Sequence, residues 1–240
     1  MALAFSEGTN NTGIVQQVRY LLRVDSTQWP TAKIVNSVNN WLDMVTGYAI
    51  GADRTFQWDD TNHTALPEGT EELTINVADY SFLTDQQGNA ILTLLGVSRL
   101  DSTTNKYVAL TEVDRTEVDT GYFGTTSGTP TAYDKIADNI IRLDYLPSAT
   151  VASGLKFFFQ RSPSYFAASD TTKSPGVAPV LHRGFVIAAA YDGALTLGLP
   201  NLQALSIERD KEEAKMKDYF ATDRNRDKEP NMSMRPINFR

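Results

Sequence analysis

Apolar residues near the start of the chain repeat with the period of an α-helix. One helical face carries Ile14, Val15, Val18, Leu21 and Leu22. A second apolar set with the same period follows Pro30, a residue suited to the first turn of a helix. We therefore predict helices over about residues 13–23 and 30–49, packed as an antiparallel hairpin because the link between them is short.

The pattern changes after Gly51 to short β-branched and aromatic runs separated by turn residues. The candidate strands are Thr55 to Trp58, Leu73 to Val77, Ile91 to Leu100, Lys106 to Leu110, Asn139 to Tyr145 and Leu155 to Arg161. We expect a mostly antiparallel sheet. Between its strands, residues 112–119 are predicted to form a short helix, and residues 121–129 an exposed loop.

Helical periodicity returns after Pro175. Residues 180–199 are apolar nearly all round and include small residues that would let a neighbouring backbone come close, which predicts a buried central helix. Residues 201–221 have a narrower apolar side, which predicts a half-exposed helix. The remaining residues are polar and interrupted by Pro230 and Pro236.

The predicted fold class is α+β. We expect an antiparallel helix bundle of about four main helices with an inserted, mostly antiparallel β region and an extended C-terminal tail. The expected parts are a flexible N-terminal lead (1–12), an N-terminal helical hairpin (13–52), an inserted β-rich region (53–165), C-terminal helices (176–222) and the tail (223–240).

Composition limits the class of protein. The chain has 240 residues, of which 41% are hydrophobic and 21% charged, so most of it should fold. It has no cysteine, signal peptide or run of 18 apolar residues, and we expect a cytoplasmic, non-membrane protein. The net charge of -7 argues against direct attraction to nucleic acid.

The sequence offers no catalytic motif. His63 follows a run of Asp and Asn residues that favours a polar turn over a metal site, and His182 is expected to make an interface contact or a helix-end hydrogen bond. Residues 121–128 lack the lysine and glycine spacing of a phosphate-binding loop. We therefore predict no catalytic residue, cofactor or metal, and a protein that is not an enzyme.

The stretch from Gly128 to Tyr165 is the most informative part of the chain. It contains a G-x-P turn, a tyrosine-bearing segment, a strand that stops at Pro147, a loop, and a second strand that ends at Pro163. Taken as physical chemistry alone, this order predicts two antiparallel strands joined as a hairpin.

The order of residues in this stretch resembles the adaptor proteins of the head-to-tail connector of tailed bacteriophages. The matching positions are Gly128, Pro130, Tyr133, Ile141, Leu143, Pro147, Leu155, Phe159, Arg161 and Pro163. Two positions depart from the pattern: Leu146 precedes a single proline, and Phe159 replaces a tyrosine. The region from Gly13 to Trp41 is similar to the N-terminal helices of these adaptors, and the last helices and tail are similar to the part that meets the portal.

This resemblance implies a structural virion protein that joins the portal ring of the capsid to the tail and lines the DNA exit channel. It implies a homo-oligomeric ring, commonly of twelve subunits, that contacts the portal protein and a tail or nozzle protein. DNA would pass without sequence recognition, and no membrane would be involved. The protein would be made in the cytoplasm of the host bacterium and lie in the neck of the virion.

The C-terminal tail is the predicted portal contact. It is mildly cationic, carries apolar residues near its end, and cannot build a core of its own, so we expect it to order on a partner. The candidate contact residues are Arg224, Arg226, Lys228, Met232, Met234, Arg235, Ile237, Phe239 and Arg240.

Other functions fit the same sequence. The chain could be a head-completion protein or a tail terminator, which share small helical or mixed folds and ring symmetry. It could also be a tail-attached module that binds carbohydrate through Trp58, Tyr122 and Phe123. The remaining alternative is an enzyme of a type that the sequence does not reveal.

Overall fold

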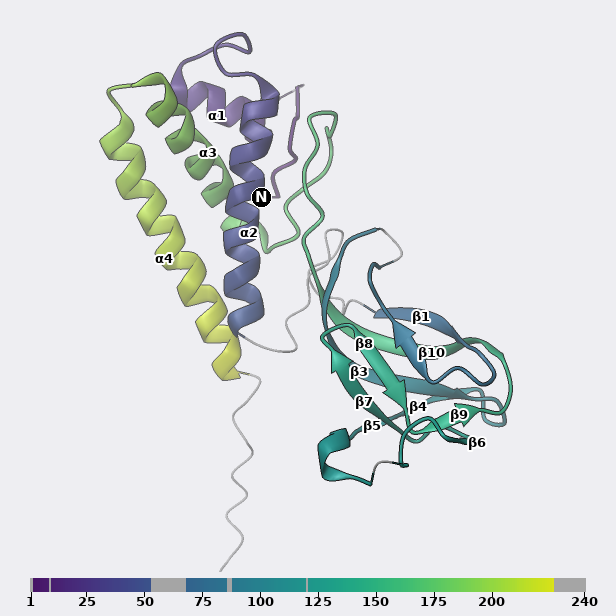
Figure 1. The fold of residues 1–240 in the computed structure, drawn as a ribbon. Coiled ribbons are helices and arrows are strands. Elements are labelled where there is room, and N and C mark those ends of the chain that lie inside the picture. Colours follow the sequence, from purple (N-terminus) through teal and green to yellow (C-terminus); the bar gives the residue numbers. More distant parts are fainter. Residues whose placement is uncertain (1, 9, 53–67, 86–87, 120, 227–240) are drawn as a thin grey trace, which may run out of the picture. The chain divides into compact units, whose positions relative to one another are not determined.

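The chain divides into two units (Figure 1). The structure is a computed structural model that describes residues 2–8, 10–52, 68–85, 88–119 and 121–226. Met1–Asp53 and Phe166–Arg240 belong to a helical unit, and Arg54–Tyr165 belong to a β unit. The helical unit is thus made from both ends of the chain.

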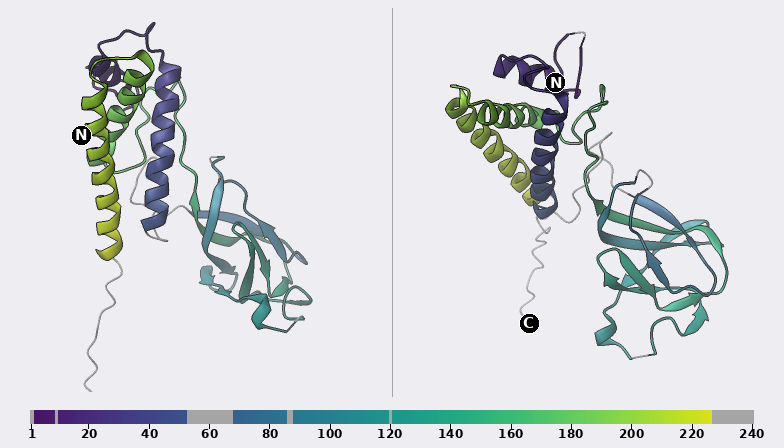
Figure 2. Two further views of the ribbon diagram at one scale, coloured as in Figure 1. Left: turned by 60° about the vertical axis from the view of Figure 1, so that its left-hand side comes forward. Right: turned by 45° about the horizontal axis from the view of Figure 1, so that its top comes forward.

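Within its described residues, the helical unit has four α-helices and one 3-10 turn. They are α1 (Ile14–Leu22), α2 (Thr31–Ala52), the turn η2 (Pro179–Leu181), α3 (His182–Leu197) and α4 (Leu202–Arg226). The main partner of α1 and of α2 is α3, which also packs against α4. Figures 1 and 2 show α1 lying across α2 near its start, so these two helices do not pack as the antiparallel hairpin expected.

Small residues explain why other helices approach α3 so closely. A Cβ atom on Gly184 would lie 2.5 Å from Met216 Cε and 3.2 Å from Trp41 Nε1. Ala188, Ala189 and Ala190 of the same helix are buried. The prediction of a buried central helix with close neighbours is confirmed.

The segment before α1 is anchored, although we expected it to be flexible. The Phe5 side chain is fully buried and stacks on Phe166 with ring centroids 5.0 Å apart. The Phe5 N–H donates to the carbonyl of Lys173, and the Leu3 N–H donates to His182 Nδ1 at 2.9 Å. A buried aromatic ring and these backbone hydrogen bonds together order a segment that has no periodicity of its own.

The β unit has ten strands within its described residues. They are β1 (Glu68–Leu73), β2 (Asp79–Ser81), β3 (Ile91–Asp101), β4 (Lys106–Ala109), β5 (Thr111–Glu112), β6 (Thr126–Gly128), β7 (Ala132–Ala137), β8 (Ile140–Leu143), β9 (Tyr145–Pro147) and β10 (Val151–Arg161). One sheet has the order β1-β10-β3-β4, a second has the order β2-β8-β7-β5, and β6 pairs with β9. The pairs β5–β7 and β6–β9 are parallel, and the others are antiparallel.

The two four-stranded sheets of the β unit share one hydrophobic core. Its buried residues are Leu73, Tyr80, Phe82, Ile91, Leu94, Val97, Leu110, Tyr133, Ile141, Leu143, Leu155, Phe157 and Phe159. They come from strands of both sheets, and Phe82 packs on Phe157 with ring centroids 4.2 Å apart. The β unit thus has the layered core of a domain that can fold by itself.

The predicted fold class is wrong about the relative amounts of helix and sheet. The protein is a sheet-rich α+β fold with three sheets, not a helix bundle that carries a smaller β insert. Six strands were expected in the whole chain, and the described residues contain ten. Four of the strands that were missed are only two or three residues long, which is too short to show alternation of apolar and polar positions. The fifth, β7, has six residues, but apolar and polar positions do not alternate along it.

The predicted pairing of strands also needs correction. The segments 139–145 and 155–161 do not form a hairpin, because β8 pairs with β7 and β2, whereas β10 pairs with β1 and β3. The strand expected at 73–77 ends at Leu73, and the loop expected at 121–129 contains β6. The short helix expected at 112–119 is the 3-10 turn η1 (Arg115–Glu117), and the strand expected at 55–58 lies outside the described residues.

Candidate interaction sites

The residues that carry the family resemblance are mostly inside the β unit. Tyr133, Leu155 and Phe159 are at most 3% exposed, and Ile141 and Leu143 are fully buried. These side chains hold the two sheets together and are not available to a partner. The resemblance therefore marks a shared core more than a shared contact surface.

A buried aspartate holds the turn at the start of this stretch. Asp144 is 1% exposed, and its carboxylate accepts hydrogen bonds from the N–H and hydroxyl of Thr131 and from the N–H of Tyr145. Its own backbone N–H donates to the carbonyl of Ala132. These bonds satisfy a charge that would otherwise be costly to bury, and they fix the turn after Pro130.

Gly128 is needed because another chain segment lies directly against it. A Cβ atom there would be 2.9 Å from Cδ1 of the Tyr145 ring. Gly128 pairs with Pro147 in the parallel register of β6 and β9. Gly128, Tyr145 and Pro147 thus meet at one place in the β unit.

The second strand of the stretch ends in a buried ion pair. Arg161 Nη1 lies 2.7 Å from Asp85 Oδ2, and the two side chains are 4% and 7% exposed. The Asp85 carboxylate also accepts the backbone N–H and the side-chain amide of Asn89. Arg161 therefore ties the end of β10 to the turn that precedes β3.

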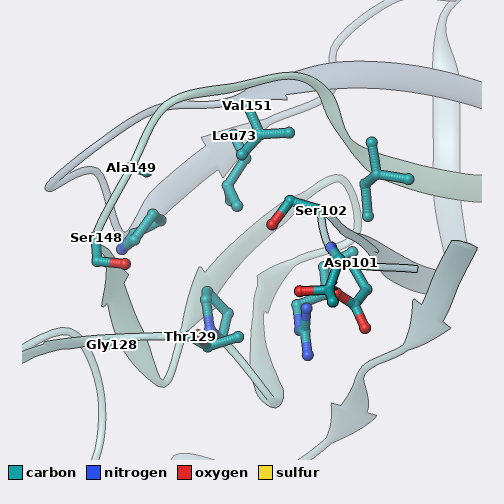
Figure 3. Close-up of a pocket in the computed structure, with 13 residues that line it drawn as sticks. Leu73, Asp101, Ser102, Gly128, Thr129, Ser148, Ala149 and Val151 are labelled. Carbon is teal, nitrogen blue, oxygen red and sulfur yellow. Dashed lines mark hydrogen bonds between the residues drawn. The ribbon is translucent and has the colours of Figure 1, made fainter. Parts of the chain in front are cut away.

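A pocket of about 240 Å³ opens where β6 and β9 approach the end of β3. The turn after β3 and the segments 128–130 and 147–149 line it. In Figure 3, Leu73 and Val151 lie together along one wall, and the hydroxyls of Ser102 and Ser148 point into the space between the two loops. Sequence reasoning missed this pocket, although Gly128, Pro130 and Pro147 had been singled out.

The predicted portal contacts lie at the end of the chain. Arg224 and Arg226 belong to the last turn of α4, which continues to Arg226 and not only to residue 221. The other candidates, Lys228, Met232, Met234, Arg235, Ile237, Phe239 and Arg240, lie outside the described residues. Their role stays a prediction.

His182 has a structural role. It is 2% exposed, its Nδ1 accepts the Leu3 N–H, and its Nε2 lies 2.9 Å from the carbonyl oxygen of Val177. Because Nδ1 accepts a backbone N–H, the imidazole is the neutral tautomer with its proton on Nε2. This is the helix-end hydrogen bond that was one of the two expected roles.

The other chemistry-bearing residues are dispersed. His63 lies outside the described residues, and no cluster of three or more acidic or histidine side chains within them is placed to hold a metal ion. Of the aromatic residues considered for carbohydrate binding, Trp58 also lies outside, while Tyr122 and Phe123 pack edge to face. No helix in the described part of the chain is long and apolar enough to span a bilayer.

Comparison with known proteins gives the class of protein. The family model of the SU10 adaptor protein matches residues 9–238. The chain therefore belongs to the SU10 adaptor protein family, and it is an adaptor-type structural protein of a bacteriophage virion. No curated protein matches it. The resemblance suggested by the stretch from Gly128 to Tyr165 is confirmed at this level.

Proposed function

We propose that this adaptor protein forms a ring that joins the portal of the capsid to the tail and surrounds the path of the DNA. The match of the SU10 adaptor family to residues 9–238 carries the proposal, because it includes both units and most of the C-terminal tail. The chain would act by contact alone, without a cofactor and without catalysing a reaction. Ring formation would use copies of this one chain, commonly twelve.

The tail is the proposed portal contact. Residues 222–240 contain five basic and three acidic residues, whereas the whole chain has a net charge of -7. Because α4 continues to Arg226, Arg224 and Arg226 belong to the end of this helix and the later basic residues follow it in the sequence. A cationic end on an acidic body would direct the chain towards an acidic surface of the portal.

The acidic body suits the proposed channel. A wall with net negative charge repels the phosphates of passing DNA, whereas a basic wall would bind and retain them. A channel lined by Lys and Arg would contradict this part of the proposal.

Mixing the purified chain with portal rings tests the proposal. We expect electron microscopy to show a second ring of adaptor subunits seated on one face of the portal. A chain truncated after Arg226 should keep its helices by circular dichroism and lose portal binding in a pull-down. Full binding by the truncated chain would refute the tail contact, and a ring that binds only tail protein would favour a tail-terminator role.

A further inference from the structure

Arg99 occupies an unusual position in β3. Two residues earlier, Val97 is buried in the core of the β unit, and alternate residues of a strand share a face. Arg99 lies directly opposite Leu155 of β10, which is fully buried. The arginine is thus on the inner face of its sheet, at the end where the pocket of Figure 3 opens.

The guanidinium of Arg99 has no hydrogen bond or ion pair to another side chain in the described part of the chain. The acidic side chain that lines the pocket with Arg99 is Asp101, and its carboxylate accepts hydrogen bonds within its own turn. The N–H of Thr103 donates to Asp101 Oδ1 at 2.9 Å, and this bond, ahead of the hydroxyl of Thr104 and the charge of Arg99, lowers the pKa of Asp101. The donors of Arg99 therefore remain open to a group from outside.

Apart from the Asp101 carboxylate, which also lines the pocket, its remaining side chains suit a small anionic group on an apolar stem. Hydroxyl side chains of Ser102, Thr103, Thr129 and Ser148 line it beside Arg99. Leu73, Val151, Pro130 and Pro147 supply apolar walls. A planar guanidinium prefers carboxylate or phosphate, which it can bind through two parallel hydrogen bonds.

We propose that this pocket binds a carboxylate, contributed by an aspartate or glutamate side chain of a partner protein. The volume of about 240 Å³ accommodates one such side chain. No aromatic residue lines the pocket, so it has no flat apolar face on which a sugar ring could stack. The site is in the β unit, so this proposal can be tested separately from the proposed contact between the tail and the portal.

Titration of the full chain with N-acetylglutamate amide, followed by amide NMR, tests the proposal. We expect saturable shifts at Thr129 and Ser148, with millimolar affinity because a single ion pair is involved. Arg99→Gln should weaken binding about tenfold or more, equivalent to about 1.4 kcal/mol. The affinity of Arg99→Lys for the probe should lie between those of the wild type and Arg99→Gln, since lysine keeps the charge but lacks the planar donors.

Three parallel measurements make the result decisive. Arg183→Gln, which changes a 65% exposed arginine in the other unit, should leave the titration unchanged. Shifts that do not saturate, or that are equal in Arg99→Gln, would overturn the proposal. Stronger binding of inorganic phosphate than of the glutamate probe would also overturn it, because it would indicate a phosphate site. Stronger binding of glucuronate than of the glutamate probe would overturn it as well, because it would indicate a sugar site.

Discussion

Arg161 and Asp85, 76 residues apart in the sequence, form an ion pair inside the β unit with Nη1 and Oδ2 2.7 Å apart. Both side chains are more than nine-tenths buried. We expect Asp85→Ala to destabilise the protein by about 3–5 kcal/mol, because it leaves the charge of Arg161 buried without its carboxylate partner. Chemical denaturation followed by fluorescence measures the change.

An exposed ion pair on the same strand is the control for this experiment. Lys156 Nζ lies 2.8 Å from Glu68 Oε2, and the two side chains are 23% and 52% exposed. Glu68→Gln should cost less than about 1 kcal/mol, because solvent already screens this pair. A similar decrease in the free energy of unfolding for the two variants would show that burial does not make the Arg161–Asp85 pair more important to stability.

Two glycines of the helical unit should respond in opposite directions to substitution by alanine. A Cβ on Gly193 would overlap Leu22 Cδ1 and lie 3.2 Å from Trp29 Cε2, so Gly193→Ala should destabilise the protein by about 1–3 kcal/mol. Gly47 has no atom within 4 Å of the same position, and Gly47→Ala should stabilise α2 by about 0.5–1 kcal/mol. Thermal unfolding of both variants tests the packing around α3; stabilisation by Gly193→Ala would contradict it.

Tyr133 should make the β unit sensitive to alkali. Burial, and next the charge of Glu112, raise the pKa of the Tyr133 phenol to about 12. Since the folded pKa exceeds the unfolded value of 10.0, this contribution to stability is complete below pH 10 and is lost as the pH rises towards 12. The loss is about 2–3 kcal/mol at most.

Tyr133→Phe should remove this part of the alkaline destabilisation. Tyr20→Phe, at a side chain that is 83% exposed, serves as the control and should not change the pH dependence. Denaturation midpoints between pH 9 and 12 give the comparison. Equal pH dependence in the wild type and Tyr133→Phe would show that the phenol of Tyr133 does not contribute.

His182 should control the order of the N-terminal segment. His182→Phe removes the acceptor of the Leu3 N–H and the partner of the Val177 carbonyl, and leaving this buried carbonyl unpaired should cost about 1–3 kcal/mol. Hydrogen exchange should then become faster at residues 3–6, while Arg183→Gln next to it should leave the exchange rates unchanged. Unaltered protection in His182→Phe would show that the burial of Phe5 alone holds the segment.

Helices could be predicted from the sequence because the apolar positions show a helical face, as in α1, or continue over many residues, as in α3. Val15 and Val18 of α1 and the alanines of α3 are examples, and all are buried as expected. Strand pairing could not be predicted, because β10 lies between β1 and β3, which precede it by many residues. Local patterns favour hairpins between neighbours in sequence, and only tertiary packing decides otherwise.

The residues that form the candidate sites also could not be grouped from the sequence, because they come from distant segments of the chain. Arg161 was recognised as a position of the family pattern, but nothing near it in the sequence indicates Asp85 as its partner. Arg99 gave a weak signal, namely a charged residue in an apolar strand two positions after Val97. Its meaning depends on Ser102, Thr129 and Ser148, which different segments bring to one pocket.

The division of the chain into Arg54–Tyr165 and a unit made from both flanks has a consequence for synthesis on the ribosome. The β unit is continuous, so its core can form as soon as it leaves the exit tunnel. Helices α1 and α2 emerge first, but α3, the partner they both need, is translated after the whole β unit. The earliest helices of the nascent chain must therefore wait longest for their native contacts.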